Sequence, residues 1–374
     1  MISRDLTVTP APEPARPYPI HLRHDALPEL IERTAALAAT GRVIVISDAT
    51  VAPLHAAPLA DALRARGVNA PLLAFAPGEE NKTLATVHAL YAQAIAAGVD
   101  RHTPIVALGG GVVGDVAGFV AATLLRGLPW IAAPTTVLAQ VDSSVGGKTG
   151  VDLPEGKNLV GAFHPPRFVF ADAAWLTTLP ARETRAGLAE AIKHAALADA
   201  PLLDRITRDG ARLAAGDLAV LAPTIADAIN IKAAIVADDP RDTGRRAILN
   251  FGHTLGHALE AATGYRALRH GEAVALGMRF AARLSTLRAG LAPAHVTRID
   301  AALDAVGLPA DWAPRIDDDV LARLATDKKS RAHSIDTILL RAIGDPCVVP
   351  RPLEALAADA RALARGFDAE KERR

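Results

Sequence analysis

Short apolar runs alternate with segments of helical periodicity through the first half of the chain, and this alternation limits the fold more than any other feature. Four runs rich in aliphatic and β-branched residues indicate buried strands: 42–48, 70–76, 104–108 and 130–134. Three segments between or beside them have helical spacing: 51–66, 82–97 and 112–125. Strands that alternate with helices in this way form a mostly parallel sheet covered by helices. We therefore predict an α/β fold for the N-terminal region.

The pattern changes near residue 180. Seven segments with helical spacing follow: 184–197, 202–214, 218–237, 250–262, 273–288, 296–306 and 320–327. Strand signal is nearly absent there until residues 335–343. A chain of 374 residues is also long enough for about two domains. We expect an α/β domain over residues 1–179 and a mainly α-helical domain over residues 180–374.

Charge and cysteine usage exclude several classes of protein. Lys+Arg and Asp+Glu both number 41, and this balance argues against a general nucleic-acid binder. The most apolar stretch, 116–141, contains Arg126 and two prolines, so it indicates a buried helix, a turn and a strand rather than a membrane span. The single cysteine, Cys347, allows no internal disulfide, and the first 20 residues lack the apolar core of a signal peptide. We expect a cytoplasmic protein.

A glycine-rich turn follows the third predicted strand. The segment Gly109 to Gly114 fits G-x-G-x-x-G, in which glycines let the backbone approach a pyrophosphate at a helix N-terminus. The ordinary dinucleotide fingerprint also has an acidic residue about 20 residues later, and none occurs between residues 116 and 141. Asp115 follows directly and is placed either to interact with the helix N-terminus or to hold a hydroxyl. The motif predicts a nucleotide-binding turn of unusual type, with a plain strand–helix turn as the alternative.

Lysines concentrate in and beside the motifs. Residues 142–150, DSSVGGKTG, resemble a phosphate loop but lack its spacing, because Ser143 stands where a P-loop needs glycine. Lys148 and Lys157 therefore lie in a predicted loop, where two close cations indicate a bound anion unless the loop is simply solvated. Only eight of the 41 basic residues are lysines, and seven of them fall near motifs. Because a lysine ammonium is not interchangeable with a guanidinium, each is a candidate for a specific role.

A metal site is indicated in the helical half. Glu190, His253 and His270 are three ligands of the kinds that catalytic zinc takes, leaving one position for substrate. His253 and His257 are four residues apart on a predicted helix and share a face, so the spacing alone leaves both as candidate ligands. The segment is not H-E-x-x-H, which disfavours a metalloprotease.

Taken together, the motifs resemble those of the 3-dehydroquinate synthases, within the sugar phosphate cyclases. The similar segments are PGEENK from Pro77, GGGVVGDVAGF from Gly109, PTT from Pro134, VDSSVGGKTG from Val141, GKNLVGAFHPP from Gly156, GLAEAIKH from Gly187, LNFGHTLGHALE from Leu249, HGEAVALGM from His270 and DKK from Asp327. They occur in order over residues 77–329, which makes the resemblance more specific than any one motif.

The resemblance implies an enzyme of aromatic amino acid biosynthesis in the shikimate pathway. Its substrate would be 3-deoxy-D-arabino-heptulosonate 7-phosphate, a phosphorylated sugar acid. A ring hydroxyl would be oxidised by NAD, phosphate eliminated, the ketone reduced, and the opened ring closed by an aldol step to 3-dehydroquinate. Zinc, with Co²⁺ as an alternative metal, would polarise the reacting oxygens. The resemblance also implies a homodimer.

The resemblance assigns roles to individual positions. Metal ligands would be Glu190, His253 and His270. NAD contacts would be Asp48, Glu79, Lys82, Gly110, Gly111, Val112, Val113, Gly114, Asp115, Thr135, Thr136, Lys148, Lys157 and Thr178. Substrate groups would be Asp142, Lys148, Asn158, Lys193, Lys232, Arg246, Asn250 and His257. Arg126, from the second subunit, and Lys328 or Lys329 would help to bind phosphate or carboxylate.

One departure from the family pattern and three alternatives remain. Asp242 stands where the family usually has glutamate, and Pro240 stiffens the same loop, which leaves the role of Asp242 open. The first alternative is another sugar phosphate cyclase, although Asn250 and His257 favour the dehydroquinate synthases. The second is a metal-dependent polyol dehydrogenase, which would release NADH and has no need for the lysine set. The third is a catalytically inactive relative, which the complete Glu–His–His set disfavours.

Overall fold

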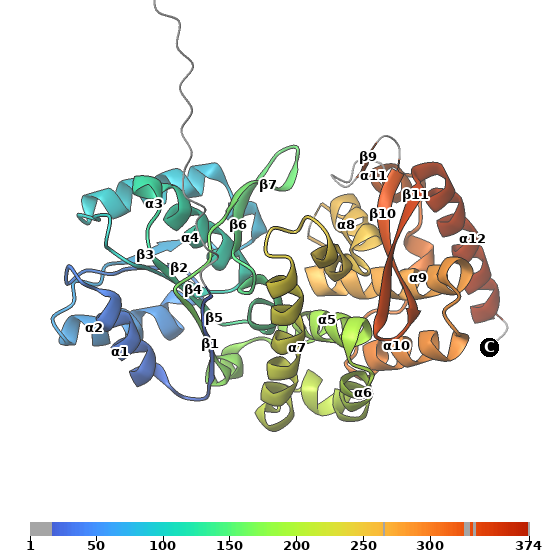
Figure 1. Cartoon of the computed structure of the whole chain (residues 1–374), viewed down its shortest axis with the longest axis horizontal. Coiled ribbons are helices and arrows are strands. Elements are labelled where there is room, and N and C mark those ends of the chain that lie inside the picture. Colours follow the sequence, from blue (N-terminus) through green and yellow to red (C-terminus); the bar gives the residue numbers. More distant parts are fainter. Residues whose placement is uncertain (1–16, 265, 325–329, 332–333, 373–374) are drawn as a thin grey trace, which may run out of the picture.

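The computed structural model describes residues 17–264, 266–324, 330–331 and 334–372. Figure 1 shows two parts side by side, a sheet flanked by helices and a cluster of helices, with α7 (Leu218–Asp238) running between them. Lys328 and Lys329 lie outside the described residues.

A six-stranded parallel sheet forms the N-terminal region. In spatial order its strands are β1 (Ile20–Arg23), β8 (Phe168–Asp172), β5 (Trp130–Pro134), β4 (Ile105–Gly109), β2 (Ile44–Asp48) and β3 (Leu72–Phe75). Every neighbouring pair is parallel. The predicted α/β fold is confirmed, with β1 and β8 added at one side of the strands that the sequence indicated.

Helices cover both faces of this sheet. They are α1 (Leu27–Leu37), α2 (Ala57–Ala65), α3 (Leu84–Ala96) and α4 (Gly111–Thr123). Along β2, Ile44 and Ile46 join the core formed with α3 and α4, whereas Val45 joins the core on the opposite face with α1 and α2. Because both faces are buried, these strands are nearly continuous apolar runs, as is usual in parallel sheets.

The chain reverses its direction of travel across the sheet between β2 and β4. From β2 it continues to β3 at one edge, whereas from β4 it continues to β5 on the other side. In open parallel sheets, ligands bind at the carboxyl ends of the two strands where such a reversal occurs. The end of β2 is Asp48, and the end of β4 is the start of the glycine-rich turn.

The prediction of a loop around Lys148 and Lys157 was wrong. A π-helical turn (Ala139–Ser143) leads into an antiparallel hairpin, β6 (Lys148–Leu153) and β7 (Gly156–Phe163), which packs on α4. Thr149 and Val151 face inward, whereas most of β7 is exposed or half-buried. The glycines and the exposed face of this hairpin weaken the strand signal in its sequence. The pairing of β6 with β7 supplies the stability that the β-propensity of the residues does not.

Eight helices make up most of the described C-terminal part, which confirms the prediction of a mainly helical region. They are α5 (Ala181–Ala198), α6 (Ala200–Ala214), α7, α8 (His253–Ala262), α9 (His270–Ala289), α10 (Pro293–Ala305), α11 (Asp318–Leu324) and α12 (Leu353–Glu372). A small antiparallel sheet of β9 (Ser330–Arg331), β10 (Ser334–Ala342) and β11 (Asp345–Pro352) lies against them. The helix predicted from residue 250 begins at His253, because Arg245–Asn250 forms a 3₁₀ turn.

By length and composition alone, α7 is apolar enough to cross a membrane. It packs against α5 and α6, and its Lys232 is 5% exposed and paired with Asp142. A charged side chain held inside the protein by a partner is typical of a core helix, and we interpret α7 as one.

Candidate active site

Close backbone contacts bring three metal-ligand candidates together. Glu190 lies in α5, whereas His253 and His270 are the first residues of α8 and α9. A Cβ at Gly271 would lie 1.8 Å from the carbonyl oxygen of Ala186, so only glycine lets α9 begin against α5. Gly252, with φ of 81°, similarly lets α8 begin against α9.

The three side chains converge around one carboxylate. The Nε2 atoms of His253 and His270 lie 3.6 and 3.5 Å from Oε1 of Glu190, and one ligand atom from each of the three residues lies within 4.8 Å of the others. The His257 ring centre lies 5.2 Å from that of His253 and 6.2 Å from that of His270, beside this group. The geometry therefore favours Glu190, His253 and His270 over a set with His257.

This donor set fits a divalent metal of the zinc type. Glu190 is fully buried, and neither of its carboxylate oxygens accepts a hydrogen bond of normal geometry among the described residues. Two imidazole nitrogens and one carboxylate oxygen are ligands that zinc and cobalt accept.

Burial and charge set the protonation of these groups. Burial alone would raise the pKa of Glu190, but the adjacent Lys193 ammonium holds it below its usual value. Burial and then Lys193 hold the pKa of His253 well below its usual value, so His253 is neutral. Burial would lower the pKa of His270, but Glu260 and Glu190 raise it to about 10. A metal that binds His270 would therefore displace a proton.

Asp142 lies next to the metal-ligand candidates and contacts two lysines and a histidine. Its Oδ1 is 2.7 Å from Nζ of Lys232, 3.9 Å from Nζ of Lys193 and 3.5 Å from Nε2 of His194. Burial would raise the pKa of Asp142, but Lys232 and Lys193 hold it well below its usual value. Burial lowers the pKa of Lys232, against the pull of Asp142. These contacts hold an ionised carboxylate between two buried lysines.

A second charged group lies between α4 and the hairpin. Nζ of Lys82 is 2.6 Å from Asp115, 2.6 Å from Oδ1 of Asn158 and 3.8 Å from Glu79, and Lys157 is 3.2 Å from Glu79. Burial would lower the pKa of Lys82, but Asp115 raises it. Four expected NAD contacts are thus adjacent. Asn158, expected to bind substrate, lies with them rather than beside Asp142.

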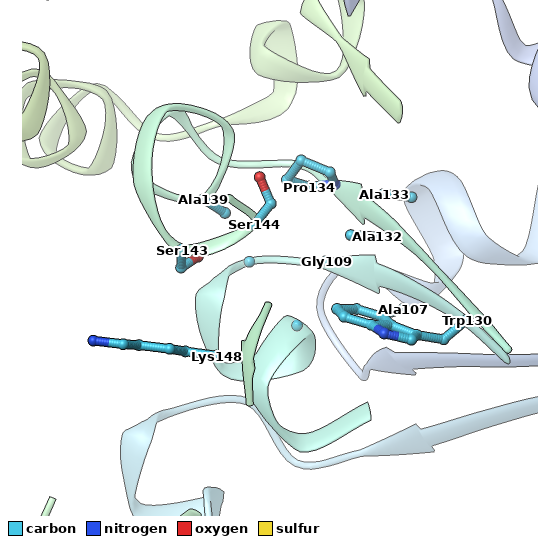
Figure 2. Close-up of a pocket in the computed structure, with 12 residues that line it drawn as sticks. Ala107, Gly109, Trp130, Ala132, Ala133, Pro134, Ala139, Ser143, Ser144 and Lys148 are labelled. Carbon is cyan, nitrogen blue, oxygen red and sulfur yellow. The ribbon is translucent and has the colours of Figure 1, made fainter. Parts of the chain in front are cut away.

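A small pocket opens at the carboxyl ends of β4 and β5. Figure 2 shows Gly109, Pro134, Ser143 and Ser144 around it, while the Lys148 side chain extends away. The Thr135 and Ser144 hydroxyls are buried without a hydrogen-bond partner among the described residues. Gly110 lies against Thr136, where a Cβ would be 3.2 Å from Cγ2.

The Lys148 ammonium pairs with Asp242. The residue that departs from the family pattern therefore contacts one of the substrate candidates. Asp242 adopts a left-handed conformation, with φ of 55°.

The remaining candidates lie at the edges of this region. Four have hydrogen bonds to other parts of the protein: Asp48 accepts from the backbone of Thr50 and Val51, Oγ1 of Thr178 lies 2.9 Å from Nε2 of His55, Arg246 donates to the carbonyls of Gly146 and Pro240, and Asn250 donates to that of Ala247. Arg126 is exposed and lies beyond the far end of the 13-residue α4, which is about 20 Å long at 1.5 Å per residue. This chain's own Arg126 is therefore remote from the glycine-rich turn.

Sequence reasoning missed two buried residues at the site. Glu260 is 3% exposed, and its Oε2 lies 3.1 Å from Nδ1 of His270. His194 is fully buried beside Asp142. Spacing contained a signal for Glu260, because positions 253, 257 and 260 share one face of a helix. His194 follows Glu190 by four residues, which also places both on one face.

Comparison with known proteins extends these observations. Two family models match consecutive parts of the chain: 3-dehydroquinate synthase N-terminal over residues 72–186, and 3-dehydroquinate synthase C-terminal over residues 187–330. The 3-dehydroquinate synthase of Pelobacter propionicus is 48% identical over 340 residues, covering 91% of this chain and 94% of the relative. That of Rhodospirillum rubrum is 47% identical over 341 residues, covering 88% and 87%.

Solved structures show the same fold. The chain is similar to a 2-epi-5-epi-valiolone synthase from Streptomyces hygroscopicus with NAD⁺ and Zn²⁺ bound, with a TM-score of 0.86, 30% identity and coverage of 98% and 100%. A 2-deoxy-scyllo-inosose synthase complexed with carbaglucose-6-phosphate, NAD⁺ and Co²⁺ gives a TM-score of 0.80 at 30% identity, covering 92% and 96%. A probable glycerol dehydrogenase from Sinorhizobium meliloti, 22% identical with a TM-score of 0.64 and coverage of 94% and 99%, shares the fold. From the two family models and the long, closely similar relatives, we conclude that this chain belongs to the 3-dehydroquinate synthase family.

Proposed function

We propose that this chain converts 3-deoxy-D-arabino-heptulosonate 7-phosphate to 3-dehydroquinate and phosphate, using NAD and a divalent metal. The observation that carries the proposal is the convergence of Glu190, His253 and His270 beside the Lys193–Asp142–Lys232 cluster. A phosphorylated sugar acid needs cations for its anionic groups, and a bound metal polarises a hydroxyl as it is oxidised. Both lie together here.

NAD would bind across the carboxyl ends of β2 and β4, and the metal between Glu190, His253 and His270. When bound, NAD would accept and return a hydride, and the metal would polarise the oxygen at the reacting carbon. The start of α4 offers backbone N–H groups to a pyrophosphate. The Lys82–Asp115 pair keeps a half-buried carboxylate at the same turn, where it is suited to accept a hydrogen bond from a ribose hydroxyl.

The buried lysines would bind and orient the substrate. Lys193 is 1% exposed and lies between the Glu190 and Asp142 carboxylates, so it can donate to a substrate oxygen beside the metal. His257 lies next to the two ligand histidines and is suited to bind a substrate oxygen there. Lys148 is half exposed at the edge of the hairpin and can turn from Asp242 to an anionic group.

We expect many phosphates to be released per NAD. Purified protein with zinc and NAD below the enzyme concentration should turn over the heptulosonate phosphate repeatedly, because the cofactor is regenerated in each cycle. Phosphate, dehydroquinate and NADH would be measured together. Accumulation of NADH in proportion to product would favour a polyol dehydrogenase, and phosphate release only from another sugar phosphate would favour a different cyclase.

The assembly follows from the same proposal. We propose a homodimer of chains with an α/β domain over residues 1–179 and a helical domain over residues 180–374, in the cytoplasm. Support for the dimer comes from Arg126, an exposed cation remote from the site of its own chain. In a dimer, Arg126 would instead bind phosphate or carboxylate in its partner's site. The single cysteine is consistent with a reducing compartment.

Mixing two inactive variants should restore activity. Arg126→Ala and Lys148→Ala would each abolish turnover alone, but a mixed dimer has one site with both parental residues. Random exchange of subunits in a closed dimer makes about one quarter of all sites parental. Phosphate release would be measured after mild dissociation and reassociation of the mixture. No recovery, in dimers shown by mass spectrometry to be mixed, would place Arg126 outside the partner's site.

A further inference from the structure

A continuous series of ion-pair contacts runs from the metal-ligand candidates to the glycine-rich turn. Nδ1 of His270 lies 3.1 Å from Oε2 of Glu260, and Oε1 of Glu260 lies 3.2 Å from Nζ of Lys157. Lys157 lies 3.2 Å from Glu79, Glu79 lies 3.8 Å from Lys82, and Lys82 lies 2.6 Å from Asp115. The chain of contacts passes from α9 through α8, the hairpin and the turn before α3 to α4.

Glu260 is the residue in this series of contacts that was expected neither as a metal ligand nor as an NAD contact. It is 3% exposed in the middle of the contacts, with one oxygen on each neighbour. Burial would raise the pKa of Glu260, but His270 and Lys157 hold it below its usual value, so the carboxylate is ionised. A buried carboxylate with two cationic partners has a fixed orientation, because each partner would be costly to leave unpaired.

The position of Glu260 on His270 has a consequence for a metal. Nδ1 of His270 donates its hydrogen bond to Glu260. The other ring nitrogen, Nε2, is therefore directed at Oε1 of Glu190, 3.5 Å away. Groups that orient a metal-binding histidine in this way typically contribute 10- to 100-fold to metal affinity.

Lys157 connects Glu260 to the region expected to bind NAD. It lies on β7, which is exposed or half-buried along its length, and it joins the hairpin to α8 through Glu260 and to the turn before α3 through Glu79. A ligand that fixes the hairpin therefore also fixes Lys157 against Glu260. When two ligands need the same ordered arrangement, the first to bind carries the cost of ordering and the second binds more tightly.

We propose that Glu260 is a positioning residue for the metal site and that, through Lys157, it makes metal and NAD bind cooperatively. The inference rests on the proposed function, because it takes the metal and NAD to bind where that proposal puts them. By linkage, each ligand should change the affinity of the other by the same factor.

The test measures binding rather than turnover. Zinc affinity would be determined by competition with a chromophoric chelator, with and without saturating NAD, in the full-length chain. We expect NAD to raise zinc affinity about fivefold or more in the parent, the lower end of typical coupling. In Glu260→Gln, which keeps an acceptor for His270, zinc affinity without NAD should fall about 10- to 100-fold, and the effect of NAD should disappear.

Two further variants separate positioning from general damage. Lys157→Gln should keep zinc affinity without NAD within about threefold of the parent, since the His270 contact remains. Because Lys157 is also an expected NAD contact, its response would be measured at an NAD concentration shown to saturate the variant, and there the effect of NAD on zinc affinity should still be lost. Glu272→Gln is the matched control, because Glu272 lies two residues from His270 but pairs with the half-exposed Arg182, and glutamine keeps an oxygen that can accept from the Arg269 backbone N–H. It should behave as the parent in both measurements.

Each outcome has a distinct reading. Zinc affinity that ignores NAD in the parent would overturn the cooperativity, and parental zinc affinity in Glu260→Gln would overturn the positioning role. If the parent couples zinc to NAD but releases no phosphate from the heptulosonate phosphate, the proposed function fails and the coupling stands. If phosphate is released but NAD does not change zinc affinity, the coupling fails and the proposed function stands.

Discussion

Glu190→Gln is expected to abolish phosphate release and zinc binding together. Glu190 is fully buried, its Oε1 faces the Nε2 atoms of His253 and His270, and glutamine keeps its shape while removing its charge. Loss of a group that only orients a ligand costs 10- to 100-fold in metal affinity, so loss of a direct ligand should cost at least about 100-fold. Turnover should fall at least about 1,000-fold, which corresponds to about 4 kcal/mol of transition-state stabilisation. Chelator competition and phosphate release measure the two effects.

The control for this variant lies on the same helix. Glu183→Gln changes a partly exposed carboxylate in the first turn of α5 that pairs with Arg269, so its zinc affinity and turnover should match the parent. Removing the Glu190 charge also leaves Lys193 without its closest anion, so thermal unfolding of the metal-free proteins would be compared. A folded Glu190→Gln protein that binds zinc as the parent does would remove Glu190 from the ligand set.

Much of the fold was predictable because local and nonlocal signals agree. The runs at β2, β4 and β5 are apolar on both faces, which only a covered parallel sheet explains, and the structure has such a sheet. The hairpin at residues 148–163 was not predictable in the same way. Only Thr149 and Val151 mark an inward face on β6, and the pairing with β7 and the packing on α4 decide the structure.

The site was predictable in composition but not in arrangement. Glu190, His253 and His270 were chosen from ligand chemistry and from the resemblance, and the structure brings them together. Spacing left His257 open as a ligand, since a helix face cannot distinguish positions 253 and 257. The choice comes from the close approach of α9 to α5 at Gly271. Asn158 lies by Lys82 because the hairpin, which was missed, carries it there.

Lys232→Met is expected to lower both stability and turnover. The Lys232 ammonium lies 2.7 Å from Oδ1 of Asp142, and the residue is 5% exposed. Removing one partner of a buried ion pair costs about 3–5 kcal/mol, because the remaining charge is left in the protein interior. Lys193 at 3.9 Å still neutralises part of Asp142, so we expect the lower end, about 3 kcal/mol. Urea unfolding of the metal-free protein measures it.

A more exposed ion pair between α6 and α7 provides the comparison. Arg205 on α6 contacts Asp227 on α7, and both side chains are partly exposed. Arg205→Met should cost at most about 1 kcal/mol and leave turnover unchanged, because water screens an exposed pair. Equal losses of stability in Lys232→Met and Arg205→Met would contradict the energetic importance of the buried pair.

The double variant Lys232→Met, Asp142→Asn separates folding from catalysis. Replacing Asp142 removes the charge that Lys232→Met leaves unpaired, so the double variant should recover at least half of the stability lost by the single one. Turnover should stay at least about 1,000-fold below the parent in both, because a cation and a carboxylate that we propose to hold substrate are absent from the double variant. Recovery of turnover with stability would mean that Lys232 and Asp142 only support the fold. Lost turnover in a stable double variant would mean that the Lys232–Asp142 pair serves catalysis beyond its support of the fold.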